Sequence, residues 1–142
     1  MTDLEIAKNE LYEENLTLAI VKDGALLFST KSHRISGFLD AIEKCNGKLV
    51  EASVADKVAG KAIALLCAYS RVKEVYASVL SRQALSVFKK YKIICHWNQL
   101  VENILDTKKT DMCPFEKAAM NISDPGKAYE TFTDLREKLR SC

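Results

Sequence analysis

Apolar positions along the chain recur with two different periods, one typical of amphipathic helices and the other of half-buried strands. The helical period predicts helices at residues 3–13, 37–45, 56–69 and 82–90, a short one from Cys113-Pro114 and a last one from Asp124-Pro125-Gly126. The alternating period predicts strands at residues 16–22, 25–30, 49–54, 72–80 and 91–97. Polar stretches at residues 31–36 and 106–111 are expected to be loops.

Local signals support the ends of several of these elements. Asp23-Gly24 between two β-rich runs is a strong signal for a β-hairpin. Asp56 and Ser81 are expected to be the N-caps of their helices. Pro125 occupies the first position of the last helix, where its missing N–H costs nothing.

The order of the elements predicts the fold. A hairpin followed by strand, helix, strand, helix and strand indicates an α/β fold in three layers, with a mixed sheet of about five strands flanked by helices. We expect the hairpin at one side of the sheet and the later strands parallel to one another. With 142 residues and no linker or repeat, residues 1–142 are expected to form a single domain.

Composition and charge exclude several classes of function. Lys and Arg number 21 and Asp and Glu number 19, so the net charge of +2 gives no electrostatic footprint for nucleic acid, and we expect no nucleic-acid partner. The longest apolar run, residues 62–69, is too short to span a membrane, and residues 1–14 lack the apolar region of a signal peptide. We therefore expect no membrane partner.

The cysteines and histidines give no metal-binding pattern. The five cysteines contain no C-x-x-C pair; they are Cys45, Cys67, Cys95, Cys113 and Cys142. An odd number without a secretion signal indicates reduced thiols and a cytoplasmic protein. His33 and His96 are far apart in the sequence, so we expect no metal site and no cofactor.

Two features weaken the predicted helix at 56–69, and such conflicts tend to mark functional sites. Lys57 and Lys61 share a face at the positive end of the helix dipole, which costs about 0.3–1 kcal/mol for each. They either bind an anion there or are solvated and paired with a nearby carboxylate. Gly60 costs about 1 kcal/mol in a helix and leaves room for a neighbouring backbone or for a ligand.

A third feature is Cys113, which takes the N-cap position before Pro114, with Glu116 at the third helical position. Ser, Thr, Asp or Asn would cap a helix better, and a thiol at a helix N-terminus can be a reactive thiolate. The alternative is a small buried thiol with a structural role. We expect the start of this helix to meet Lys57 and Lys61 in one concave pocket that suits an anionic ligand.

Four sequence blocks carry a resemblance to a known family. They are V-K-D-G at residues 21–24, V-A-D-K-V-A-G-K-A at 54–62, V-K-E-V-Y-A at 72–77 with Ser81, and M-C-P-F-E-K at 112–117. Over about residues 16–139 the chain resembles a prokaryotic family that is defined as a domain of unknown function and has the cytidine deaminase-like fold.

The resemblance implies the position of a pocket. Zinc deaminases of this fold place H-x-E at the start of the helix that is here predicted to begin at Asp56, and P-C-x-x-C at the start of the helix that follows Ser81. Neither motif is present, so deamination by zinc-activated water is not expected. By analogy of location, the residues that border the same pocket are Asp56, Lys57, Lys61, Ser78, Ser81 and Arg82.

These features favour a metal-free enzyme that acts on a small anionic metabolite, such as a nucleotide or nucleobase derivative. Lys57 and Lys61 would bind the anionic group, Cys113 would be the nucleophile, and Glu116 or Asp56 would be the general acid or base. The alternative is a non-catalytic small-ligand-binding or accessory module on the same scaffold. The sequence leaves open whether the protein is an enzyme and whether it forms a homo-oligomer.

We predict that the purified protein carries no stoichiometric zinc, because its cysteines and histidines lack the close spacing of zinc ligands. Elemental analysis of the purified protein measures this directly. A content of about one zinc per chain, lost when Cys113 and His96 are replaced, would contradict the prediction.

Overall fold

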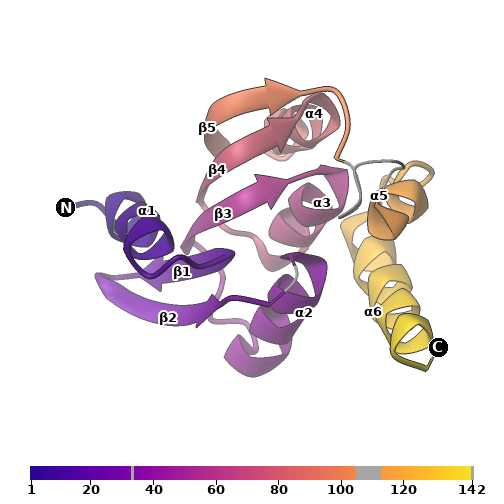
Figure 1. Ribbon diagram of the computed structural model, residues 1–142, viewed down its shortest axis with the longest axis horizontal. Helices are drawn as coiled ribbons and strands as arrows, with labels where there is room; N and C mark the ends of the chain where they lie inside the picture. The colour runs from indigo at the N-terminus through magenta and orange to yellow at the C-terminus, as the bar shows by residue number, and fades with distance from the viewer. Residues whose placement is uncertain (33, 105–112, 142) are drawn as a thin grey trace.

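The computed structural model describes residues 1–32, 34–104 and 113–141. Its elements follow the chain as α1 (Asp3–Glu13), β1 (Leu18–Lys22), β2 (Ala25–Thr30), α2 (Arg34–Cys45), β3 (Ser53–Ala59), α3 (Lys61–Ser70), β4 (Glu74–Ser81), α4 (Arg82–Lys90), β5 (Ile94–Val101), α5 (Pro114–Ala119) and α6 (Pro125–Ser141) (Figure 1). The loop expected at residues 106–111 lies outside the described residues, as do His33 and Cys142. Among the described residues, no helix combines the length and apolar character needed to cross a membrane.

The five strands form one mixed sheet in the order β2-β1-β3-β4-β5. β1 is antiparallel to both β2 and β3, whereas β3, β4 and β5 are parallel to one another. Parallel neighbours need a crossover connection, and α3 and α4 provide the two that this sheet requires. The predicted α/β fold is therefore confirmed, with its mixed five-stranded sheet, its hairpin at one side and its parallel later strands.

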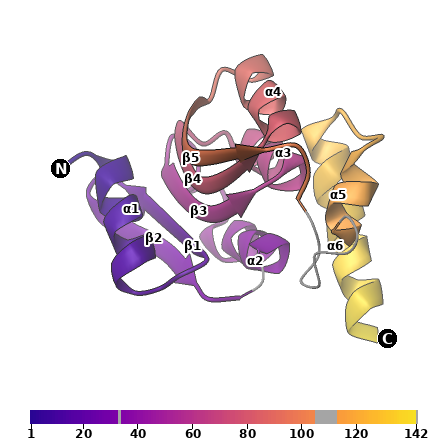
Figure 2. The same ribbon diagram turned by 45° about the horizontal axis from the view of Figure 1, so that its top comes forward.

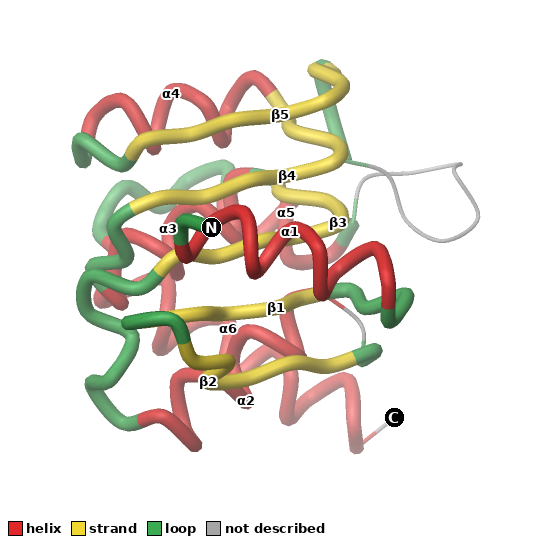
Figure 3. The backbone as a smooth tube through the Cα atoms, turned by 90° about the vertical axis from the view of Figure 1, so that its left-hand side faces the viewer, coloured by secondary structure: helices red, strands yellow, loops and turns green. Residues whose placement is uncertain are grey.

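Helices cover both faces of this sheet (Figure 1, Figure 2). α1 lies over β1, β3 and part of β4 on one face, as Figure 3 shows. α2, α3 and α4 pack on the other face, and α5 and α6 pack against α3. The larger core lies on the side of α2, α3 and α4 and includes Phe38, Leu66 and Phe88, while a smaller core under α1 includes Ala7 and Ala55.

The start of α1 is tied to the hairpin. Thr2 caps the helix by accepting a hydrogen bond from the Glu5 N–H at 3.2 Å, and the spacing of Thr2 and Glu5 is that of a capping box. The carboxylate of Asp3 accepts hydrogen bonds at 2.9 Å from the N–H groups of Asp23 and Gly24 in the hairpin turn. Both turn residues have positive φ, which favours the Asp-Gly pair found there.

One predicted helix begins too early in the sequence-based assignment. Residues 56–59 belong to β3, and α3 begins at Lys61 with Gly60 as its N-cap. The assignment of Asp56 as an N-cap is therefore wrong, and Gly60 does not lie inside the helix. The strand expected at residues 49–54 correspondingly begins only at Ser53.

The physical reason is that two periods coincide in this stretch. Val54 and Val58 are four residues apart, and this spacing places two residues on one face of a helix. The same spacing also places them on one face of a strand, where every second residue points to the same side. Pairing decides the outcome, because β1 on one side and β4 on the other satisfy the backbone groups of β3. Lys57 therefore lies on a strand, where the helix dipole has no bearing on it.

The last strand was also predicted with the wrong ends. β5 begins at Ile94 and continues to Val101, four residues beyond the predicted end at Trp97. The residues beyond Trp97 were not predicted as strand because Asn98 and Gln99 are polar and are poor indicators of a strand. They are tolerated because β5 is the edge strand and both side chains are exposed.

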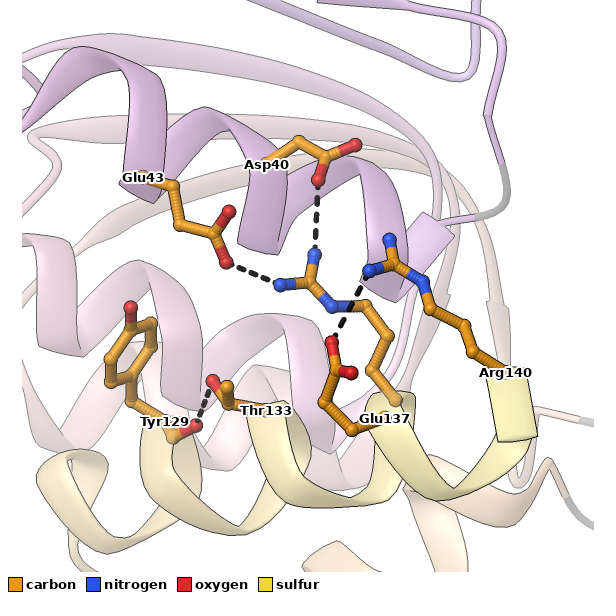
Figure 4. A network of polar contacts seen from close by, with 7 residues as sticks. Asp40, Glu43, Tyr129, Thr133, Glu137 and Arg140 are labelled. Carbon is orange, nitrogen blue, oxygen red and sulfur yellow. Dashed lines mark hydrogen bonds and ion pairs between the residues drawn. The ribbon is translucent and has the colours of Figure 1, made fainter.

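Arg136 joins α6 to α2. Its buried guanidinium donates one hydrogen bond to Asp40 at 3.0 Å and another to Glu43. Figure 4 shows both carboxylates directed from α2 toward α6. A guanidinium is buried at tolerable cost only where it is paired, so this contact fixes how the two helices lie against each other.

We predict that Arg136→Met lowers the free energy of unfolding by about 2 kcal/mol, because two carboxylates lose their cation and a buried pairing is broken. Urea unfolding followed by circular dichroism measures the change. The matched control is Arg140→Met, which removes an exposed pair with Glu137 and should change the stability by no more than about 0.5 kcal/mol. Equal effects of the two substitutions would contradict the role given to Arg136.

Candidate functional site

The parallel strands β3, β4 and β5 end at one edge of the sheet, where α3 and α4 begin and α5 packs beside α3 (Figure 2). In sheets of this kind, ligands bind outside the carboxyl ends of the strands. A cavity of about 230 Å³ lies there, lined by Lys61, Gln83, Asn103, Ile104, Glu116 and Met120. A larger cavity of about 710 Å³ lies near the amino ends of β4 and β5, but none of the predicted site residues lines it.

The carboxylate of Glu116 reaches from α5 to the first turn of α3. Its two oxygens accept hydrogen bonds from the N–H of Lys61 at 3.0 Å and from the N–H of Ala62 at 2.9 Å. The residue at the N-cap of α3 is Gly60, which has no side chain that could accept them. Glu116 therefore caps α3 from a distant part of the sequence, and its charge faces the positive end of the helix dipole.

Gly60 is required by this contact. A Cβ placed at Gly60 would lie 2.8 Å from one oxygen of the Glu116 carboxylate and closer still to the other. The sequence suggested that Gly60 leaves room for a neighbouring backbone or for a ligand. In the structure the room is filled by a side chain of the protein itself.

Lys61 is the predicted ligand-binding residue that lines the cavity. Its ammonium group donates a hydrogen bond to the carbonyl oxygen of Met120 at 3.3 Å. Gln83 donates through its amide to Asn103 at 3.4 Å across the same cavity. Among the described residues, the lining thus combines one cation, two amide groups, one carboxylate and the apolar side chains of Ile104 and Met120.

Lys57 and Ser78 lie elsewhere, in a groove of about 350 Å³ that is also lined by residues of α1. The prediction that Lys57 and Lys61 point into one pocket is therefore wrong. Its premise was a helix that would place both lysines on one face, but Lys57 belongs to β3 and Lys61 to α3.

Tyr12 lines the same groove as Ser78 and is paired with Tyr76. The hydroxyl of Tyr12 is hydrogen-bonded to that of Tyr76 at 2.5 Å and to that of Ser78 at 2.7 Å. Burial tends to raise the pKa of Tyr12, but the hydrogen bonds with Ser78 and Tyr76 and the charge of Lys8 lower it overall. Burial and the hydrogen bond with Tyr12 raise the pKa of Tyr76, so Tyr12 is the more acidic partner.

The other predicted pocket residues have local roles. Asp56 is 1% exposed within β3, and its side chain accepts a hydrogen bond from the N–H of Val58 at 3.3 Å. Ser81 is the N-cap of α4, as predicted, and its hydroxyl accepts a hydrogen bond from the N–H of Ala84 at 3.1 Å. Arg82 forms an exposed ion pair with Glu102 at 2.5 Å.

Cys113 is the N-cap of α5, as the sequence predicts, but its side chain forms no capping hydrogen bond. It is 3% exposed and belongs to the larger core. Among the other cysteines, burial raises the pKa of Cys45 and Cys67, and it raises the pKa of Cys95 to about 12, so these three thiols are protonated at neutral pH. This arrangement favours structural thiols over nucleophiles.

The sequence analysis missed four residues of the cavity, namely Gln83, Asn103, Ile104 and Met120. The sequence could have indicated two of them, because Gln83 and Asn103 are polar residues just beyond the carboxyl ends of β4 and β5, where ligands bind in such sheets. Asn103 could not be identified in this way, since the predicted end of β5 was too early. Met120 follows α5 and lines the cavity because α5 lies against α3, a contact to which Glu116 contributes.

Comparison with protein families gives a match over residues 6–136 to the family described as TM1506, domain of unknown function (DUF1893). The chain belongs to this family. The resemblance drawn from the sequence blocks is thereby confirmed for the family, as a domain of unknown function. A comparison with curated proteins found no significant match.

Solved structures agree with this assignment to the DUF1893 family. The crystal structure of a DUF1893 family protein (TM1506) from Thermotoga maritima has a TM-score of 0.76 at 22% identity, and the match covers 87% of this chain and 83% of that one. A structure of Acinetobacter baumannii RibD matches with a TM-score of 0.50 at 16% identity, over 59% of this chain and 28% of that one. At these identities the likeness concerns the fold, and it confirms the predicted deaminase-like architecture.

The resemblance stated above places the zinc ligands of deaminases at the starts of α3 and α4, and the described residues of this DUF1893 chain at these two places do not fit a zinc ion. The starts of α3 and α4 carry Lys61 and Arg82, whose cationic groups do not bind metal ions. Within residues 1–32, 34–104 and 113–141, no group of three His, Cys, Asp or Glu side chains is placed to hold a metal.

We predict that Glu116→Ala and Gly60→Ala each lower the free energy of unfolding by about 2 kcal/mol, because each removes the carboxylate cap of α3. The double variant should be destabilised by clearly less than the sum, since the Cβ at position 60 has no carboxylate to displace. Thermal and urea unfolding measure all three. Glu130→Ala, at an exposed position on α6, is the control and should have almost no effect. Additive losses in the double variant would argue against the contact.

Proposed function

We propose that this DUF1893 protein is a non-catalytic binding module for a small anionic ligand, held in the cavity at the carboxyl ends of β3, β4 and β5. The observation that carries the proposal is the ammonium group of Lys61, which lines this cavity and donates to the carbonyl oxygen of Met120. A carbonyl has only a partial negative charge. An anionic group in the cavity would therefore gain a charge-assisted hydrogen bond with Lys61, with which no carboxylate among the described residues forms an ion pair.

The remaining lining suggests the class of ligand. The amides of Gln83 and Asn103 offer donors and acceptors to a polar edge, and Ile104 and Met120 offer an apolar surface to a ring. The cavity of about 230 Å³ is smaller than the pockets that hold drug-sized ligands. A nucleobase derivative with one acidic group fits both the size and the chemistry.

The charge of Glu116 does not oppose an anionic ligand strongly. Both carboxylate oxygens accept hydrogen bonds from the start of α3, and the helix dipole offsets part of their charge. The same contact occupies the N–H groups of Lys61 and Ala62, which are therefore not free to bind an anion. Recognition of the acidic group therefore falls to Lys61.

A metal-free enzyme draws less support from the geometry. Its nucleophile, Cys113, is enclosed in the core, and Asp56 does not line the cavity. Glu116 would have to leave the start of α3 before it could accept a proton from a substrate. The proposal keeps the expectations of a cytoplasmic protein without nucleic-acid or membrane partners, which rest on composition.

Orotate is a suitable probe, because it is a pyrimidine with a carboxylate, and uracil is the matched ring without one. We expect isothermal titration calorimetry to detect orotate binding and much weaker binding of uracil. Lys61→Ala should weaken orotate binding by about tenfold or more, the usual effect of losing a hydrogen bond to a charged group.

Lys57→Ala is the matched control, because Lys57 lies in the other groove, and it should bind orotate as the parent does. The proposal fails if neither orotate nor inorganic phosphate binds the parent protein. It also fails if the Lys61→Ala and Lys57→Ala variants bind equally well.

A further inference from the structure

β5 is an edge strand whose outer side is exposed. It forms the end of the sheet, next to β4, and most of its residues are solvent-exposed. Two large apolar side chains are among them, with Ile94 53% exposed and Trp97 40% exposed. An edge of this kind presents unpaired N–H and C=O groups that another strand can bind.

The two edges of the sheet differ in how they are protected. On the β2 edge, the pairing of β1 with β2 shifts register between Ile20 and Val21, an irregularity typical of a β-bulge that discourages further pairing. β5 pairs with β4 in one continuous register from Ile94 to Val101. It contains no Lys, Arg, Asp, Glu, Pro or Gly, which are the residues that usually block an edge.

The uncovered surface extends onto one face of the sheet. α1 lies over β1, β3 and part of β4 and leaves β5 uncovered, as Figure 3 shows. On β5, His96 is hydrogen-bonded to Glu74 of β4 at 3.0 Å, which holds the imidazole close to the sheet. Within the part of the chain that the structure describes, the outer side of β5 is therefore open to a second strand.

The sequence of β5 is complementary to itself when it is reversed. Lys92 precedes the strand and Glu102 follows it, and Trp97 lies midway between them. In an antiparallel pair centred on Trp97, the turn that holds Lys92, two residues before β5, brings this residue of each copy near Glu102 of the other. Within these ends Ile94 lies opposite Leu100, so apolar residues meet apolar residues on both sides of the centre.

We propose that two copies of this chain form a symmetric dimer in which their β5 strands pair antiparallel, with the two-fold axis at Trp97. The interface is isologous, because the same strand serves both copies. It extends the sheet continuously across the dimer through main-chain hydrogen bonds. The terminal Lys92–Glu102 pairs fix the register, since a shift of the strands would separate both pairs at once. The ion pair of Glu102 with Arg82 is exposed, so the Glu102 carboxylate stays accessible to the second copy.

The dimer can be tested by charge reversal at the ends of the strand. We expect sedimentation equilibrium to show a dimer for the parent protein. Lys92→Glu and Glu102→Lys should each weaken the dimer by about tenfold or more, because both ends of the pair become repulsive. The Lys92→Glu/Glu102→Lys double variant restores opposite charges and should dimerise as the parent does.

Mixing the two single variants gives a sharper test of the register. One strand then has two acidic ends and the other two basic ends, so the heterodimer should be tighter than either homodimer.

Trp97 is the only tryptophan of the chain, and its fluorescence emission should shift to longer wavelength when the parent dimer is diluted and should not shift in the single variants. Lys138→Glu, at an exposed position on α6, makes the same change of charge away from β5 and should leave the dimer intact.

The proposal is wrong if the parent protein stays monomeric over the whole range of concentrations used for sedimentation. It is also wrong if the double variant and the mixture of single variants stay as weak as the single variants while their circular dichroism shows native folding. Retention of orotate binding by monomeric variants would separate this result from the function proposed for the cavity.

Discussion

The hydrogen bonds between the Glu116 carboxylate and the start of α3 hold the edge of the sheet where the parallel strands end. They join α5 to a helix that lies in the core against the sheet, and they supply the cap that Gly60 lacks. They also place Met120 beside Lys61, so that one wall of the cavity follows from this contact. The two residues therefore act together: the carboxylate of Glu116 caps α3, and the absence of a side chain at Gly60 leaves the space that this carboxylate occupies.

The sequence predicts the order and type of the elements well, because each strand and helix has its own period and its own turn signals. The hairpin at Asp23-Gly24, the first helix and the Ser81 cap are all local features, and each is found in the structure. The boundary at Gly60 was missed, because a strand and a helix share the same spacing of valines there and only pairing with β1 and β4 decides between them.

The candidate site was predicted only in part, since its residues come together through contacts between distant parts of the chain. Lys61 and Glu116 were both identified, but the carboxylate was expected to act as an acid or base and instead caps α3. Lys57 was assigned to the same place because a helix was expected around it. No spacing in the sequence shows that Glu116 lies beside Gly60, and so the sequence could not show that the start of α3 is already filled.

The contacts of the C-terminal helices have a consequence for the order in which the fold can be completed. The Asp3 contact with the hairpin spans 20 residues, whereas the contacts of Glu116 with Lys61 and of Arg136 with Asp40 span 55 and 96 residues. Contacts that close short loops form early, and those that close long loops form late. During synthesis the sheet can therefore be assembled before α5 and α6 exist, but the first turn of α3 then still lacks its cap. The cap of α3 at the cavity and then the Arg136 contact between α6 and α2 are therefore expected to form after the sheet.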